Sequence, residues 1–255
     1  MIGGAGPFSI LEHRLQWFIK IRPEFLLASN FRLLNSVPMP KWAKFIIAIV
    51  LLPVCFGALH ALWLMFGRLG GADRTLVPML AGAACWVCIF VLLPKPMWIY
   101  VFGHEFTHAL WAWLFGGKVK KFKATSKGGH VVVTKTNFLI ALAPYFFPIY
   151  VVLVVLVFVV GHLIWNWSQF AVWFHLLVGA AYAFHVTLTW HILKTRQSDI
   201  TEEGYVFSSV VIFLGNIGVL LIGIPLVTAK VDLLSVFGWW FEGTGMFLHR
   251  LARVF

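Results

Sequence analysis

Two histidines and a glutamate, His104, Glu105 and His108, stand in the middle of a long apolar stretch of this 255-residue chain. If that stretch is helical, residues four apart lie on one face, so both imidazoles can point at one ion. Glu105 follows about 100° around the helix, within reach of a water molecule on that ion. This HExxH spacing is typical of zinc hydrolases, in which the histidines bind zinc and the glutamate acts as general base.

The surroundings of the motif favour a metal site over a structural polar cluster, which is the alternative for so short a pattern. Ionisable side chains inside a membrane segment are costly, and in most cases they are functional. Two histidines and a glutamate within one such segment are hard to explain as packing. We therefore expect these three side chains to form part of a metal site.

The composition indicates a polytopic membrane protein that forms one integral unit. The chain is 61% hydrophobic and 11% charged, with a mean hydropathy of +0.90, whereas soluble domains have roughly 45–50% apolar and 25% charged residues. The formal charge of +11 would suggest nucleic acid in a soluble protein. Here the Lys and Arg residues lie in loops and flanking segments, where they face anionic lipid headgroups. We expect contact with the lipid bilayer and no nucleic-acid partner.

Hydropathy predicts an all-α polytopic membrane protein with about six transmembrane helices. The expected spans are 45–66, 76–93, 97–115, 137–161, 170–193 and 204–227, and Pro144 and Pro148 are expected to kink the fourth. The chain then divides into an interfacial amphipathic segment (1–44), two accessory helices (45–96), a metalloprotease-like membrane core (97–227) and an interfacial C-terminal segment (228–255).

A basic segment, residues 118–136, follows the HExxH helix and differs from the rest of the chain. Two β-prone runs flank Ser126-Lys127-Gly128-Gly129, which predicts a β-hairpin. One interpretation is a loop that faces solvent or headgroups. The other is an edge strand that lines the site and takes an extended substrate by strand addition. The segment is basic because of Lys118, Lys120, Lys121, Lys123, Lys127 and Lys135.

A hydrolytic zinc site usually needs three protein ligands, so one more residue must join the two histidines. Asp199 lies just past the expected fifth span, in a short polar segment that could fold back against the third span. We favour it, although its structural role could be to cap the sixth span. The alternatives for the third ligand are Glu202, His130, His185 and His191.

These features resemble the site-2 protease family of intramembrane zinc metalloproteases, most closely its compact bacterial M50B-like branch. The matching residues are HEFTH at 104–108, Gly116-Gly117, the hairpin ending in Gly128-Gly129, Leu142-Ala143-Pro144 and the later Asp199, over roughly residues 97–227. Many members have an Asp-Gly pair, whereas Ile200 follows Asp199 here. The resemblance implies a helical core around Zn²⁺, with two His and one Asp as ligands, in a bacterial inner (plasma) membrane.

We therefore predict an intramembrane zinc metalloprotease that hydrolyses peptide bonds of membrane-embedded or membrane-proximal substrates. His104, His108 and Asp199 would bind Zn²⁺, and Glu105 would be the catalytic base; the substrate-binding residues are unknown. The expected partners are a membrane protein or peptide substrate and a regulatory membrane partner. Two alternatives are a non-proteolytic membrane assembly component that retains the zinc site and a zinc or proton transporter. A transporter would require paired acids across the bilayer, of which this chain has almost none.

Overall fold

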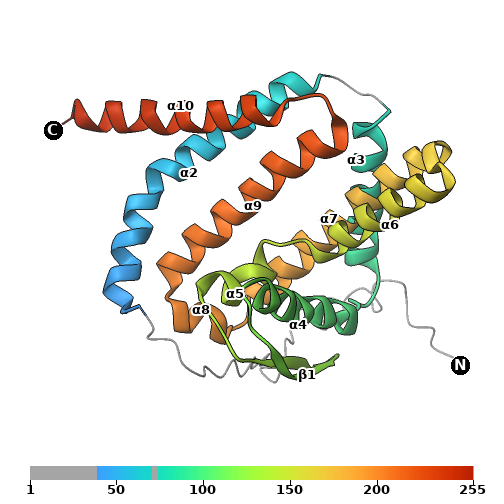
Figure 1. Ribbon diagram of the computed structural model, residues 1–255, viewed down its shortest axis with the longest axis horizontal. Helices are drawn as coiled ribbons and strands as arrows, with labels where there is room; N and C mark the ends of the chain where they lie inside the picture. The colour runs from blue at the N-terminus through green and yellow to red at the C-terminus, as the bar shows by residue number, and fades with distance from the viewer. Residues whose placement is uncertain (1–38, 71–73, 255) are drawn as a thin grey trace, which may run out of the picture.

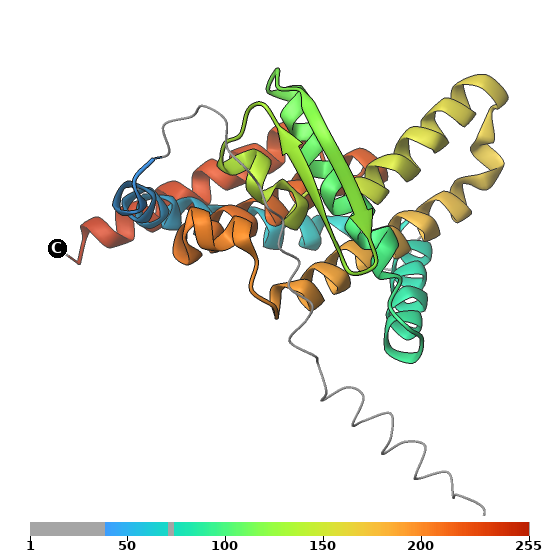
Figure 2. The ribbon, with the colours of Figure 1, turned by 90° about the horizontal axis from the view of Figure 1, so that it is seen from below.

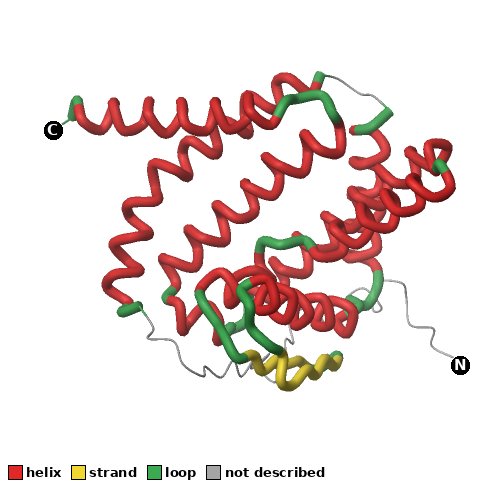
Figure 3. Tube along the Cα trace, in the orientation of Figure 1, coloured by secondary structure: helices red, strands yellow, loops and turns green. Residues whose placement is uncertain are grey.

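The computed structural model describes residues 39–70 and 74–254, and this part of the chain is mostly helical (Figures 1 and 3). A small antiparallel hairpin follows the HExxH helix, which confirms the predicted all-α class with a basic hairpin. Most of the amphipathic segment expected at 1–44 lies outside the described residues. The elements are α2 (Lys41–Leu69), α3 (Leu76–Leu92), α4 (Met97–Leu114), β1 (Val119–Thr125), β2 (Gly128–Val133), α5 (Phe138–Leu142), η1 (Ala143–Tyr145), α6 (Ile149–Trp165), η2 (Trp167–Phe170), α7 (Ala171–Leu193), α8 (Ser198–Glu203), α9 (Tyr205–Thr228) and α10 (Leu233–Ala252).

The apolar helices make this an integral membrane protein, but the expected number of six spans is not confirmed. Among the described residues, three helices are long and apolar enough to cross a bilayer: α2, η2 continued by α7, and α9. The α5–η1 and α6 pair would be a fourth if it counts as one span. Two expected spans fall short, because α3 has only 17 residues and α4 has His104, Glu105 and His108 at its centre.

A sharp bend interrupts the expected fourth span. Residues 138–145 and α6 meet at 79°, with Pro144 in η1 and Pro148 just before α6. A proline tends to kink or break a helix, because it lacks the backbone N–H and its ring clashes with the turn before it. The kink predicted from these two prolines is confirmed. Beyond the bend, α6 and α7 form an antiparallel pair that projects from the rest of the molecule (Figure 2).

The helices α3 and α7 pack backbone against backbone through two glycines. A Cβ added to Gly82 of α3 would lie 1.9 Å from the carbonyl oxygen of Leu176, and one added to Gly179 of α7 would lie 1.9 Å from that of Met79. Lipid tails are as apolar as Leu, so helices in a bilayer associate through such close contacts between small residues. This glycine contact fixes α3 against α7, the helix that precedes α8 in the chain.

Replacing Gly179 by Ala should therefore separate α3 from α7 and destabilise the protein. Overpacking a close contact typically costs about 1–3 kcal/mol, which corresponds to a few degrees in the midpoint of thermal unfolding. The measurement is thermal unfolding in detergent. Gly223→Ala on α9 is the matched control, because a Cβ there meets nothing within 4 Å. Equal midpoints for the two variants would show that the glycine contact does not matter.

The hairpin lies along α4 (Figure 2). Successive side chains of a β-strand point to opposite faces, so every second residue of β2 faces α4. Gly129, Val131 and Val133 are buried, while the residues between them are more exposed. Val131 and Val133 share a hydrophobic cluster with Ala109 and Ala112 of α4. Because alternate residues face the same side, Gly129 also faces α4, next to Glu105 of the HExxH motif.

The C-terminal helix α10 packs across α2. A Cβ at Gly57 of α2 would meet Thr244 of α10, and Phe56 stacks on Phe247 with ring centroids 4.2 Å apart. The indole N–H of Trp240 donates to the carbonyl oxygen of Val54 at 3.0 Å. Residues 228–255 thus contain a helix fixed to α2, and its place at the membrane interface stays a prediction.

Candidate metal centre

The helix α4 places the side chains of the HExxH motif inside the protein. His104, Glu105 and His108 are 9%, 1% and 0% exposed. The imidazole rings of the two histidines, one turn apart, have centroids 5.0 Å from each other. The spacing of four residues thus brings both rings to one side of the helix, as helical geometry requires.

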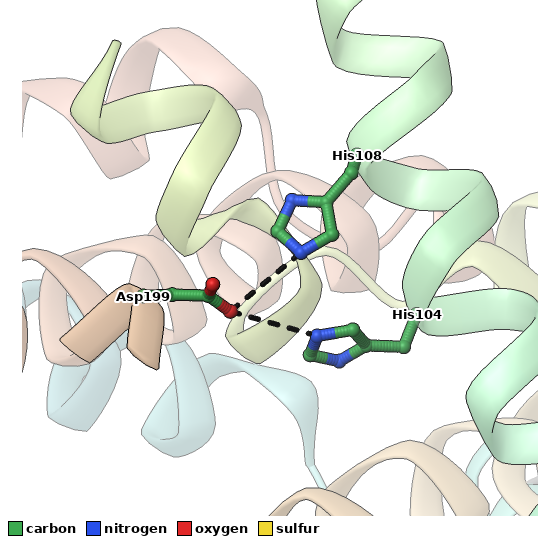
Figure 4. Close-up of side chains that lie close together, drawn as sticks. All are labelled: His104, His108 and Asp199. Carbon is green, nitrogen blue, oxygen red and sulfur yellow. Dashed lines mark ion pairs between the residues drawn. The ribbon is translucent and has the colours of Figure 1, made fainter. Parts of the chain in front are cut away.

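Asp199 approaches the two histidines from α8 (Figure 4). Its Oδ2 lies 3.7 Å from Nε2 of His104 and 3.6 Å from Nε2 of His108, and one donor atom from each residue lies within 4.8 Å of the others. These separations are too long for hydrogen bonds. They are close to the roughly 3.3 Å expected between two ligands of a tetrahedral zinc ion with bonds of about 2.0–2.1 Å.

Neighbouring groups orient two of the three donors. Nδ1 of His108 lies 2.8 Å from the carbonyl oxygen of Ile140. A carbonyl can only accept, so Nδ1 has the proton and the lone pair of the ring lies on Nε2, the atom nearest Asp199. The hydroxyl of Tyr145 donates to Oδ2 of Asp199 at 2.9 Å. These outer contacts hold the donor atoms in a ligand-like orientation.

The charge state of Asp199 also suits a metal ligand. Burial tends to raise the pKa of its carboxyl group, but positive charge on the imidazoles of His104 and His108 outweighs burial and lowers that pKa below its ordinary value. A cation bound between the three groups would favour the carboxylate in the same way, and the carboxylate is the form that binds metal ions.

Buried polar atoms around the group fit a bound cation. Both carboxylate oxygens of Glu105 and Nδ1 of His104 are buried and have no hydrogen-bond partner among the described residues. Polar atoms in such positions are costly unless an ion, a water or a protein group satisfies them. Two imidazoles and one carboxylate are a zinc-type donor set that leaves a fourth position open. The buried group could hold such a metal ion.

The structure separates Asp199 from the other candidates for the third ligand. Within the described part of the chain, the only group of three donors close enough for a metal ion is the one that contains Asp199. Glu202 is exposed on α8, and His130 pairs with Lys123 in the hairpin. His185 lies on α7 and lines a cavity of about 10 Å³ together with His104. His191 lies on the last turn of α7.

Asp199 does not cap the following long helix, so the capping role considered for this residue is wrong. It is the second residue of α8, and the N-cap of α9 is Gly204. Gly204 has φ +95°, a backbone conformation that favours glycine. The chain therefore turns at Gly204, and α8 remains a separate short helix that faces α4.

Two residues near the motif have roles that the sequence did not reveal. A Cβ on Gly129 would lie 2.6 Å from Cγ of Glu105 and 2.8 Å from its Oε1, so this position of β2 lies directly against the glutamate. The sequence marked Gly129 only as a turn residue. Tyr145, the partner of Asp199, follows Pro144 in the bent segment, and no local pattern distinguishes it from other aromatic residues.

Residues 75–195 match the family described as Peptidase M50B-like, which confirms the resemblance indicated by the motifs. No curated protein and no solved structure matched the chain. The matched segment begins earlier than the expected 97–227, because it includes α3, and it stops before Asp199. It contains both histidines, Glu105 and the hairpin, whereas α2, α8 and α9 lie outside it.

Proposed function

Because residues 75–195 form a Peptidase M50B-like domain, we propose that this integral membrane protein is a zinc metalloprotease that hydrolyses peptide bonds within or beside the bilayer. The observation that carries the proposal is the convergence of His104, His108 and Asp199 beside the buried Glu105. Nε2 of each histidine and Oδ2 of Asp199 would hold the metal ion.

In this proposal each residue of the site has a separate role in the reaction. A bound zinc ion would polarise the scissile carbonyl group and lower the pKa of the attacking water. Glu105 would accept a proton from that water and donate it to the leaving amine. Its two oxygens have no partner among the described residues, so they are available for proton transfer. Tyr145 and the carbonyl group of Ile140 would keep Asp199 and His108 in place.

The hairpin supports a role in presenting the substrate. An extended peptide can add to the free edge of a sheet through main-chain hydrogen bonds. Gly129 of β2 lies against Glu105, so a peptide bound along this hairpin would run past the general base. The donor group is buried in a chain whose described part has three helices long and apolar enough to cross a bilayer. The substrate class proposed is therefore a membrane-embedded or membrane-proximal segment of another protein.

Elemental analysis and proteolysis of the same preparation test the proposal. The detergent-purified chain should contain about one zinc per chain, since three ligands and an open position suit one ion. A strong chelator should abolish cleavage of a transmembrane peptide substrate, and added zinc should restore it. Glu202→Gln is the control variant and should keep both properties, because Glu202 is exposed.

Absence of zinc from the wild type, after growth and purification with added metal, would overturn the proposal. Zinc bound at full occupancy without any cleavage of membrane peptides would instead favour a non-proteolytic assembly component.

A further inference from the structure

A buried ion pair joins α2 to α8, which are far apart in the sequence. Nζ of Lys44 lies 2.5 Å from Oε2 of Glu203, and the two side chains are 7% and 16% exposed. Lys44 is the one buried lysine in the part of the chain that the structure describes. Charges taken out of water are costly unless they stay paired. The position of Lys44 therefore constrains the position of Glu203.

The helix α8 needs such an external anchor because it is only six residues long. Isolated helices shorter than about 12–15 residues are marginal, since few hydrogen bonds compensate for fixing the backbone. Asp199 and Glu203 are four residues apart, so they lie on the same side of α8, about 6 Å apart along its axis. A restraint on Glu203 is therefore transmitted to Asp199 through a single helical turn.

Apolar packing holds the same junction. Ala48, one turn after Lys44 on α2, belongs to the same buried hydrophobic cluster as Ile200 of α8, and Leu51 packs against that cluster. Ile200 directly follows Asp199 in the chain. One face of α2 thus supplies a charge to the helix that presents the third donor and an apolar surface to the cluster that contains Ile200.

From this arrangement we infer that Lys44 is a positioning residue: its ion pair with Glu203 fixes α8 so that the Asp199 carboxylate faces His104 and His108. The inference rests on the proposed function, because Asp199 matters here as a metal ligand. It assigns to α2, which lies outside the Peptidase M50B-like segment, a part in completing the metal centre.

The test is the zinc dissociation constant of the detergent-purified full chain, measured by competition with a chromophoric chelator. Loss of a direct outer partner of a ligand typically costs 10–100-fold in metal affinity. The Lys44–Glu203 pair acts through one turn of α8, so we expect a weakening near the lower end of that range in Lys44→Met and in Glu203→Gln. The exchanged pair, Lys44→Glu with Glu203→Lys, should recover most of the affinity. The matched controls are Lys41→Met and Glu202→Gln, which replace exposed neighbours and should bind zinc as the wild type does.

Two further measurements separate positioning from general stability. The absorption spectrum of bound Co²⁺ should change in the single variants and return in the exchanged pair, because it reports the geometry of the ligands. An unchanged zinc dissociation constant with a lower unfolding midpoint would overturn the inference, since the pair would then stabilise the fold alone. If Lys44→Met does not give monodisperse protein, Glu203→Gln provides the same test, because it breaks the same ion pair by replacing the less buried of the two residues. If the wild type binds no zinc, the proposed function is refuted. If the wild type binds zinc and the Lys44 and Glu203 variants bind it equally well, only this inference is refuted.

Discussion

Glu105→Gln should lower peptide hydrolysis by about 10²–10⁴-fold, the usual contribution of a general base, while the protein keeps its zinc. The amide has nearly the volume of the carboxylate, so it fits the same buried space beside Gly129, but it cannot accept the proton of the attacking water. Glu105 is not among the three residues that could hold the metal ion, so zinc content should not fall. The measurement is the rate of product formation, with elemental analysis of the same sample.

The control for this experiment is Glu242→Gln, which neutralises an exposed acid on α10 and should leave the rate unchanged. Hydrolysis at the wild-type rate in Glu105→Gln would remove Glu105 from the reaction. A cellular function that survives Glu105→Gln and is lost in His104→Ala would identify a metal site that serves assembly instead of proteolysis.

Asp199→Ala should lower zinc affinity by more than about 100-fold, beyond the 10–100-fold typical of outer contacts, and should abolish cleavage. The substitution removes one of three proposed ligands, and it also leaves the buried hydroxyl of Tyr145 without its acceptor. Asp199→Asn should give an intermediate affinity, because the amide oxygen can still accept from Tyr145 but has no negative charge. Chelator competition on purified protein measures both variants.

Glu202→Gln serves as the neighbouring control, since Glu202 lies on α8 outside the donor group. Full zinc occupancy and unchanged affinity in Asp199→Ala would exclude this residue as a ligand. His185, which lines a small cavity with His104, would then be the next residue to replace.

The parts of the centre that the sequence could predict depend on local geometry. The period of the α-helix brings His104 and His108 to one side of α4 whatever the rest of the chain does. The kink follows from Pro144 and Pro148, and the hairpin follows from the turn residues around Gly128. Each of these features needs only a few neighbouring residues, so a single sequence suffices.

The approach of Asp199 was harder to predict, because it depends on how α7 and α8 pack against α4. Asp199 and Glu202 lie in the same polar segment, and only the direction of α8 buries the first and exposes the second. Lys44 is a similar case. Its charge placed it in the expected interfacial segment 1–44, whereas the structure buries it against Glu203. Long-range pairing of this kind has no local sequence signature.

The number of spans could not be predicted because hydropathy counts apolar residues and is insensitive to bends. Residues 138–165 are apolar enough for one span, yet they turn by 79° at residues 146–148. The expected span at 97–115 is also not confirmed, because the centre of α4 contains the buried polar side chains of the motif. The motif that indicates function is thus also the feature that makes this helix less apolar.

The glycine contact between α3 and α7 has a consequence for biogenesis. Membrane helices insert individually and associate afterwards, and contacts between distant segments form late. The partner of α3 is synthesised only after α4, the hairpin and α6, so the glycine face of α3 stays without its partner helix until α7 enters the bilayer. The arrival of α7 also brings α8 with Asp199. The order of synthesis therefore delays completion of the metal-binding group until most of the chain has been inserted, so a chain that stops before α8 cannot assemble it.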